Sequence, residues 1–265
     1  MTAGSHSLVV DGTRLEYRWI GEAPDAAITL VFLHHGLGSV STWKNFPDRV
    51  VAENRIGGLV YSRAGYGRSD PIELPRPLTF MEDEARDVVG KVLDATGVQK
   101  AILIGHSDGA SIAAVYAGGS GDLRVRGLVL MAPHFFTEEV TRAKGREITH
   151  DFEEGDLRER LARHHEHVDI AFQGWADAWQ DPGFKDWDIT EYLDYIRVPI
   201  LAIQGEDDGH GTLAHIDALD EIMAPVEKLV LPDCGHSPYL EQPEATLEAI
   251  TDFVNRLVEV HDESV

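Results

Sequence analysis

A serine in a short glycine-bounded turn is the residue of this chain best placed to act as a nucleophile. Ser107 is the centre of the pentad GHSDG at 105–109, which follows an apolar run and precedes small and apolar residues at helical spacing. A strand, a sharp turn and a helix around G-x-S-x-G form a nucleophile elbow, which lifts the serine hydroxyl above the edge of a sheet. The N-terminus of the following helix offers free N–H groups to a developing oxyanion. The sequence therefore predicts nucleophilic catalysis by Ser107.

A serine hydroxyl needs a base to take its proton, and the base needs a carboxylate to orient it. Two polar segments downstream of Ser107 offer these partners, each directly after a predicted strand. GEDDG follows the strand expected at 198–204, and DCGHSP follows the strand expected at 226–231. We expect the acid to come from the first segment and the base, His236, from the second.

Strands and helices alternate along most of the chain, which predicts a mostly parallel sheet with helices on both faces. The alternation stops between 135 and 195, where the chain is rich in charged, histidine and aromatic residues and has a helical pattern. We predict an α/β core domain, 1–134 and 196–265, with a helical cap, 135–195, inserted over the edge where ligands bind in open α/β folds. The expected strands lie at 8–12, 14–20, 28–33, 59–61, 101–104, 127–131, 198–204 and 226–231, and the main expected helices at 42–54, 80–96, 213–223 and 243–260.

The chain resembles a capped serine hydrolase of the α/β-hydrolase fold superfamily, over nearly its whole length outside the cap. The resemblance rests on the loop HHGLGS at 34–39, the pentad, a G-x-x-D motif at 205–208 and a G-H-x-P…E-x-P motif at 235–243. It implies a Ser107–His236–Asp208 triad. It also implies that the backbone N–H groups of Leu37 and Asp108 bind the oxyanion.

The resemblance implies a serine hydrolase that cleaves a small carboxylic ester, a thioester or a lactone through an acyl-enzyme, without a metal or an organic cofactor. Two alternatives stay open. Carbon–carbon bond hydrolases of ring-cleavage products use the same triad on anionic substrates, for which Arg63 and Arg68 are the nearby basic candidates. A non-catalytic ligand receptor on the same fold is the second alternative, and rapid multiple turnovers would exclude it.

Four further residues are candidates for binding the substrate. His35 and His134 lie at predicted strand ends near Ser107. Trp175 and Trp179 recur at helical spacing and share one face of a predicted cap helix. That face either packs on the core domain or forms the roof of an apolar pocket.

Charged residues near the elbow and in the cap have simpler interpretations. The side chain of Asp108 favours the helix dipole, or else pairs with a cationic group of the substrate. The histidines at 164, 165 and 167 point in different directions on a helix. We interpret them as a solvated face of the cap and expect no metal site there.

Composition limits the partners of the chain. It carries 23 Lys and Arg against 46 Asp and Glu, a net charge of −23, which repels phosphate backbones and anionic lipids. We expect a small-molecule substrate, no nucleic-acid or membrane partner, and a monomer or homodimer. The single cysteine, Cys234, excludes an intrachain disulfide, and residues 1–7 lack the pattern of a signal peptide. These features predict a cytoplasmic protein.

Overall fold

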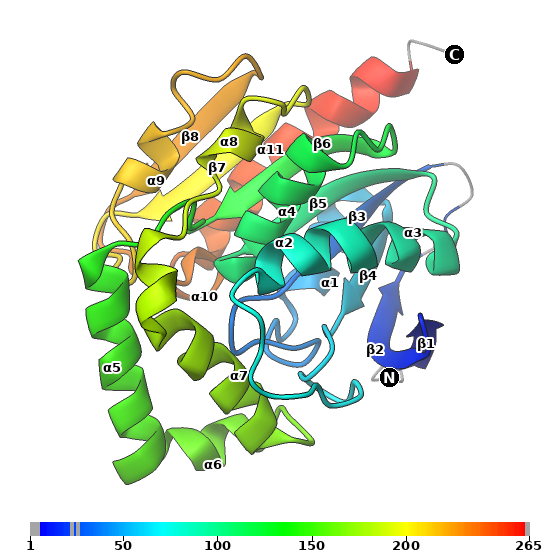
Figure 1. The fold of residues 1–265 in the computed structure, drawn as a ribbon. Helices are drawn as coiled ribbons and strands as arrows, with labels where there is room; N and C mark the ends of the chain where they lie inside the picture. Colours follow the sequence, from blue (N-terminus) through cyan, green and yellow to red (C-terminus); the bar gives the residue numbers. More distant parts are fainter. Residues whose placement is uncertain (1–5, 22–23, 25–26, 263–265) are drawn as a thin grey trace.

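An eight-stranded sheet forms the centre of the computed structural model, which describes residues 6–21, 24 and 27–262 (Figure 1). Its strand order is β1-β2-β4-β3-β5-β6-β7-β8. The first two strands are antiparallel to their neighbours, and β3 to β8 run parallel. The strands are β1 (His6–Val10), β2 (Thr13–Ile20), β3 (Ile28–Leu33), β4 (Gly57–Tyr61), β5 (Lys100–His106), β6 (Val125–Met131), β7 (Ile200–Gly205) and β8 (Val226–Leu231). The predicted α/β fold with a mostly parallel sheet is confirmed.

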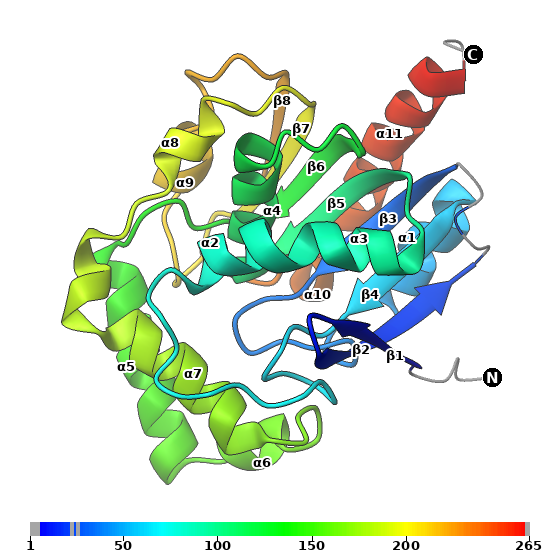
Figure 2. The ribbon, with the colours of Figure 1, turned by 45° about the vertical axis from the view of Figure 1, so that its right-hand side comes forward.

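Helices cover both faces of this sheet, as Figures 1 and 2 show. The helical elements are α1 (Phe46–Asn54), α2 (Phe80–Glu84), the π-helical turn η1 (Ala85–Val89), α3 (Gly90–Thr96), α4 (Asp108–Gly119), α5 (Glu139–Glu154), α6 (Leu157–Leu161), α7 (Val168–Gln180), η2 (Pro182–Asp186), α8 (Thr190–Leu193), α9 (Ala214–Asp217), α10 (Pro238–Glu241) and α11 (Pro243–Asp262). In the part of the chain described, none of them is both long and apolar enough to cross a lipid bilayer.

Successive side chains of the central strands pack into two hydrophobic layers, one on each face of the sheet. In β3, Leu30 and Phe32 pack with residues of α1 and α11, whereas Val31 and Leu33 pack with residues of α2, α3 and α4. Because successive side chains of a strand point to opposite faces, a fully apolar strand is what a sheet covered on both sides requires.

The chain between β6 and β7 forms helices α5, α6 and α7, which lie together to one side of the sheet (Figures 1 and 2). They share the lining of a cavity with residues that follow β3, β5, β7 and β8. These helices therefore face the carboxyl ends of the parallel strands. We keep the name cap, and the predicted bounds 135–195, for this segment.

Three predicted helices differ from the observed ones. The helix expected at 42–54 begins only at Phe46, because Lys44 has a φ of 54° and Pro47 occupies the first helical turn. The helix expected at 213–223 is reduced to α9, and turns follow it toward Pro225, which disfavours helical backbone at the residue before it. The helix expected at 80–96 is present but is interrupted by η1.

Candidate active site

Ser107 occupies a strained turn between β5 and α4. Its φ of 54° and ψ of −121° lie in a region that residues other than glycine seldom adopt. Its N–H group donates a 2.9 Å hydrogen bond to the carbonyl oxygen of Met131. A Cβ atom at Gly109 would collide with the carbonyl oxygen of Leu33, and one at Gly105 would collide with Gly109. The two glycines of the pentad therefore allow the close approach of strand and helix that the turn requires.

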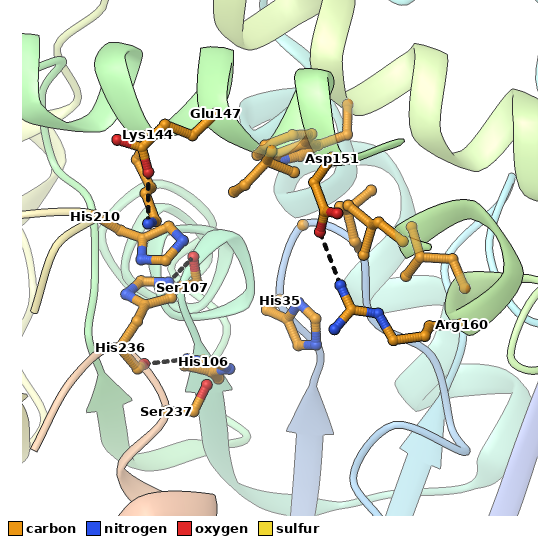
Figure 3. A pocket seen from close by; sticks show the side chains of 16 residues that line it. His35, His106, Ser107, Lys144, Glu147, Asp151, Arg160, His210, His236 and Ser237 are labelled. Atoms are coloured by element: carbon orange, nitrogen blue, oxygen red, sulfur yellow. Dashed lines mark hydrogen bonds and ion pairs between the residues drawn. The ribbon is translucent and has the colours of Figure 1, made fainter. Parts of the chain in front are cut away.

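The structure brings Ser107, His236 and Asp208 into one hydrogen-bonded series, of which Figure 3 shows Ser107 and His236. The Oγ atom of Ser107 lies 2.9 Å from Nε2 of His236, and Nδ1 of His236 lies 2.8 Å from Oδ2 of Asp208. An Nδ1–H group that donates to the carboxylate leaves the Nε2 lone pair facing the serine hydroxyl. This is the geometry in which an imidazole can accept the serine proton.

The carboxyl group of Asp208 is held in its ionised form. Its side chain is only 1% exposed, and burial by itself would raise its pKa. Contacts with His210 and His236 outweigh burial and hold the pKa well below its ordinary range. The backbone N–H of His210 donates to Oδ1 at 2.7 Å, and the side chain of Gln204 donates to Oδ2 at 2.7 Å. Asp208 is thus fixed as an acceptor for His236.

Two backbone N–H groups next to Ser107 are free to bind a ligand. Leu37, Gly36 and Ser107 line the same cavity. Asp108 is the first residue of α4, where an N–H group has no acceptor within the helix. Among the described residues, neither the Leu37 nor the Asp108 N–H group has a hydrogen-bond acceptor. Their positions suit the binding of a developing oxyanion.

The loop that carries Leu37 is held from two sides. On the core side, the His35 carbonyl oxygen accepts from Nη2 of Arg63 at 3.0 Å. On the cap side, the Leu37 carbonyl oxygen accepts from Nε2 of His165 at 2.9 Å. The Nδ1 atom of His165 accepts from the Gly67 N–H at 3.0 Å. The interpretation of the cap histidines as a solvated face is therefore wrong for His165, which is 4% exposed because it is folded onto this loop.

A cavity of about 570 Å³ lies above Ser107, between the core domain and the cap. Its apolar lining combines one side chain of the core loop with side chains of α5, α6 and α7: Leu37, Ile148, Leu157, Leu161 and Trp175. Two cap cations also reach it, each bound to an acid. Lys144 lies 2.7 Å from Glu147, and Arg160 lies 2.8 Å from Asp151; Figure 3 shows the first pair on the side of His210 and the second on the side of His35.

Two of the four predicted substrate-binding residues line this cavity. These are His35 and Trp175. Trp179 and His134 are not among the residues that line it, so the cavity does not support a contact of either with the substrate. The His134 ring is packed between Trp179 and His236, at centroid distances of 5.3 Å and 5.6 Å. Although the two tryptophans lie one turn apart on α7, only Trp175 lines the cavity, and the Trp179 ring contacts His134, which follows β6.

The basic and acidic candidates near the elbow are also kept from the cavity. Arg63 is buried, with its guanidinium group against His34 and the His35 carbonyl. Arg68 is exposed elsewhere on the surface. Burial raises the pKa of the Asp108 carboxyl, even though Arg63 lowers it, and its Oδ2 atom has no hydrogen-bond partner among the described residues. None of these three side chains lines the cavity as a substrate-binding charge.

The residue types that could ligate a metal gather within the same site. Ligand atoms of Asp208, His210 and His236 lie within 4.8 Å of one another. Two of these residues already share the hydrogen bond that orients the imidazole. The arrangement therefore has an explanation without an ion.

Comparisons with known proteins agree with this fold. A model of the alpha/beta hydrolase family matches residues 30–249. The enol-lactonase from Burkholderia xenovorans LB400 is 22% identical, with a TM-score of 0.74 over 94% of this chain and 100% of that one. A thermophilic esterase from Thermogutta terrifontis is 20% identical, with a TM-score of 0.73 over 96% and 99%. A serine hydrolase involved in carbazole degradation is 16% identical, with a TM-score of 0.75 over 95% and 98%. At these identities the solved structures show a shared fold.

Proposed function

Because this chain belongs to the alpha/beta hydrolase family, we propose that it is a serine hydrolase that cleaves a small carboxylic ester, or a lactone or thioester, through an acyl-enzyme. The observation that carries the proposal is the series Ser107–His236–Asp208 at the floor of a cavity, with two free N–H groups beside it. Acyl transfer needs a nucleophile, a base and oxyanion donors, and the hydroxyl, the imidazole and the two N–H groups support the proposal in these three roles. Water is the only co-reactant, so the reaction requires no metal or organic cofactor.

The proposed reaction has two halves. The Oγ atom of Ser107 attacks the ester carbonyl while Nε2 of His236 takes the hydroxyl proton, and the N–H groups of Leu37 and Asp108 bind the oxyanion. The carbon–oxygen bond to the leaving group then breaks, and His236 returns the proton to the departing alkoxide. Water attacks the acyl-enzyme with His236 again as the base, which frees the carboxylic acid and restores the Ser107 hydroxyl.

The cavity favours an uncharged substrate with an apolar acyl group. Its lining offers apolar side chains from the cap, and both cations that reach it are neutralised by neighbouring acids. A dianionic ring-cleavage product would need unpaired basic groups, and neither Arg63 nor Arg68 lines the cavity. The ester is therefore preferred over the carbon–carbon bond as the substrate. We extend the proposal to a small-molecule partner, because the acidic composition repels phosphate backbones and anionic lipids, and to a cytoplasmic location, because a single cysteine suits a reducing compartment.

A panel of chromogenic substrates tests this proposal. We expect multiple rapid turnovers of neutral p-nitrophenyl esters of medium acyl length, slower turnover of the matching hemiester with a free carboxylate, and no cleavage of a dienolate ketone. Assays on a lactone and a thioester with the same acyl group would rank the leaving groups. A single slow turnover with retained product would instead support a ligand receptor, and cleavage of the dienolate alone would support a carbon–carbon bond hydrolase.

A comparison of Trp175→Ala with Trp179→Ala distinguishes a side chain that contacts the substrate from one that only stabilises the cap. Burial of an aromatic ring of the substrate is worth about 2 kcal/mol, so loss of Trp175 should raise KM for aryl esters roughly 30-fold. Uniform binding changes KM more than kcat. Trp179 packs on Phe184 and Trp187, is buried and is not among the residues that line the cavity, so its loss should instead lower the free energy of unfolding by about 3–5 kcal/mol.

Steady-state kinetics with aryl and acetate esters, together with chemical denaturation, measures both effects. Turnover of the acetate ester should fall less than that of the aryl ester in Trp175→Ala, because acetate loses no aromatic contact and only the packing of the indole on Gly36 changes. Equal rises of KM in the two variants, without loss of stability in Trp179→Ala, would show that both rings contact the substrate.

A further inference from the structure

We propose that His165, a residue of the cap, positions the oxyanion hole by holding the loop that carries Leu37. The inference rests on the proposed function, because it assigns Leu37 the role of an oxyanion donor. It goes further by making the geometry of this donor depend on the cap. Nothing in the motif pattern of the core points to such a residue.

The hydrogen bonds of His165 fix both its tautomer and the loop. Its Nδ1 atom accepts from the Gly67 N–H at 3.0 Å, so the proton of the neutral ring is on Nε2. That N–H group donates to the Leu37 carbonyl oxygen at 2.9 Å. Burial lowers the pKa of His165 to about 4, so the ring is neutral at ordinary pH and keeps one donor and one acceptor. A single buried side chain thus joins two loops of the core.

Further cap contacts reach the same region. The N–H of Glu166 donates to the Gly67 carbonyl oxygen at 2.8 Å, and the His164 ring lies 2.8 Å from the hydroxyl of Ser41. The Trp175 indole lies so close to Gly36 that a Cβ atom there would collide with it. The loop is therefore held between the cap and Arg63, which binds the His35 carbonyl from below. Together with the turn in which the Gly38 N–H donates to the His35 carbonyl oxygen at 2.9 Å, these contacts set the direction of the Leu37 N–H.

Loss of the His165 ring removes the support on one side. The Leu37 carbonyl and the Gly67 N–H would each lose a buried partner, and the loop can relieve this by rotating its peptide groups. Rotation would turn the Leu37 N–H away from the oxyanion. Removal of a whole oxyanion donor costs about 10²–10³ in kcat, so a misaligned donor should cost on the order of tenfold or more. KM for a neutral ester should change little, because the donor acts on charge that develops in the transition state.

The test compares His165→Ala with His165→Gln and with His167→Ala. The Gln amide carries a carbonyl acceptor and an N–H donor, so it can replace both hydrogen bonds. His167 is a neighbouring cap histidine at the N-cap position of α7, and its side chain makes no capping hydrogen bond. Kinetics on one neutral ester would be combined with inhibition by an alkyl boronic acid, which forms an anionic tetrahedral adduct with the serine. Hydrogen exchange of residues 34–39 would report on the loop directly.

We expect His165→Ala to lower kcat at least tenfold, to weaken boronic acid inhibition by a similar factor, and to speed hydrogen exchange in the loop. His165→Gln should recover most of each effect, and His167→Ala should match the wild type. Three outcomes would overturn the proposal. These are unchanged hydrogen exchange of the loop in His165→Ala, a rise in KM as large as the expected fall in kcat, and a Gln variant no better than the Ala variant. The exchange measurement needs no turnover, so absence of ester hydrolysis in the wild type would refute the proposed function without deciding the role of His165.

Discussion

Ser107→Ala is expected to abolish ester hydrolysis while the protein keeps its fold. The Oγ atom lies 2.9 Å from the base and is the only atom that the substitution removes. The strained backbone at residue 107 is stabilised by the hydrogen bond from its own N–H to Met131, which alanine keeps. Loss of a serine nucleophile in a serine protease lowers kcat on the order of 10⁶-fold, and we expect a loss of that size here. Steady-state kinetics and thermal unfolding of the variant measure the two parts of this result.

Active-site labelling provides a sharper control for the same substitution. A fluorophosphonate should phosphonylate Ser107 alone, because among the hydroxyl groups that the structure describes only this one faces an imidazole held by a carboxylate. Ser237 lines the same cavity, so Ser237→Ala is the matched control and should be labelled as the wild type is. Labelling that survives Ser107→Ala but disappears in Ser237→Ala would assign the nucleophile to Ser237.

The parts of the fold that the sequence could predict are those whose causes are local. Residues 105–109 form a turn between a strand and a helix that are adjacent in the chain, and their glycines report a close approach of backbones within that unit. Ile28–Leu33 is apolar throughout, so its burial on both faces follows from composition alone. The positions of Asp208 and His236 follow because parallel strands place their carboxyl ends at one edge.

The contacts of the cap could not be predicted from the sequence, because they join segments that are far apart in the chain. His165 meets Leu37 across 128 positions of the chain, and no local pattern marks it from the histidines beside it. In the sequence, Lys144 and Arg160 are typical of surface charges on amphipathic helices. Only the structure shows that both line the cavity above Ser107. Trp175 and Trp179 have the same helical spacing in the sequence, and only the folded structure distinguishes Trp175, which lines the cavity, from Trp179, which does not.

Asp208→Asn is expected to lower kcat/KM by about four orders of magnitude, and Asp207→Asn by less than a few-fold, relative to the wild type. Asp208 lies 2.8 Å from Nδ1 of His236, and its other oxygen accepts the His210 N–H at 2.7 Å. An amide in this place keeps the size of the side chain but can present N–H₂ to Nδ1, which moves the imidazole proton to Nε2. The ring then cannot accept the proton of Ser107, and the imidazolium that forms in the reaction loses its counter-charge.

Asp207→Asn is the matched control for Asp208→Asn. Asp207 has an exposed side chain, and its contribution to the loop is a backbone N–H that donates to the Cys234 carbonyl oxygen at 2.9 Å. Asn keeps that backbone bond, so Asp207→Asn changes only the net charge near the site. Kinetics of both variants at several pH values, with thermal unfolding as a check on folding, measures the difference. A large loss in Asp207→Asn together with an active Asp208→Asn would move the orienting acid to Asp207. It would also mean that the loop after β7 rearranges during catalysis, because the carboxylate of Asp207 would have to reach Nδ1 of His236.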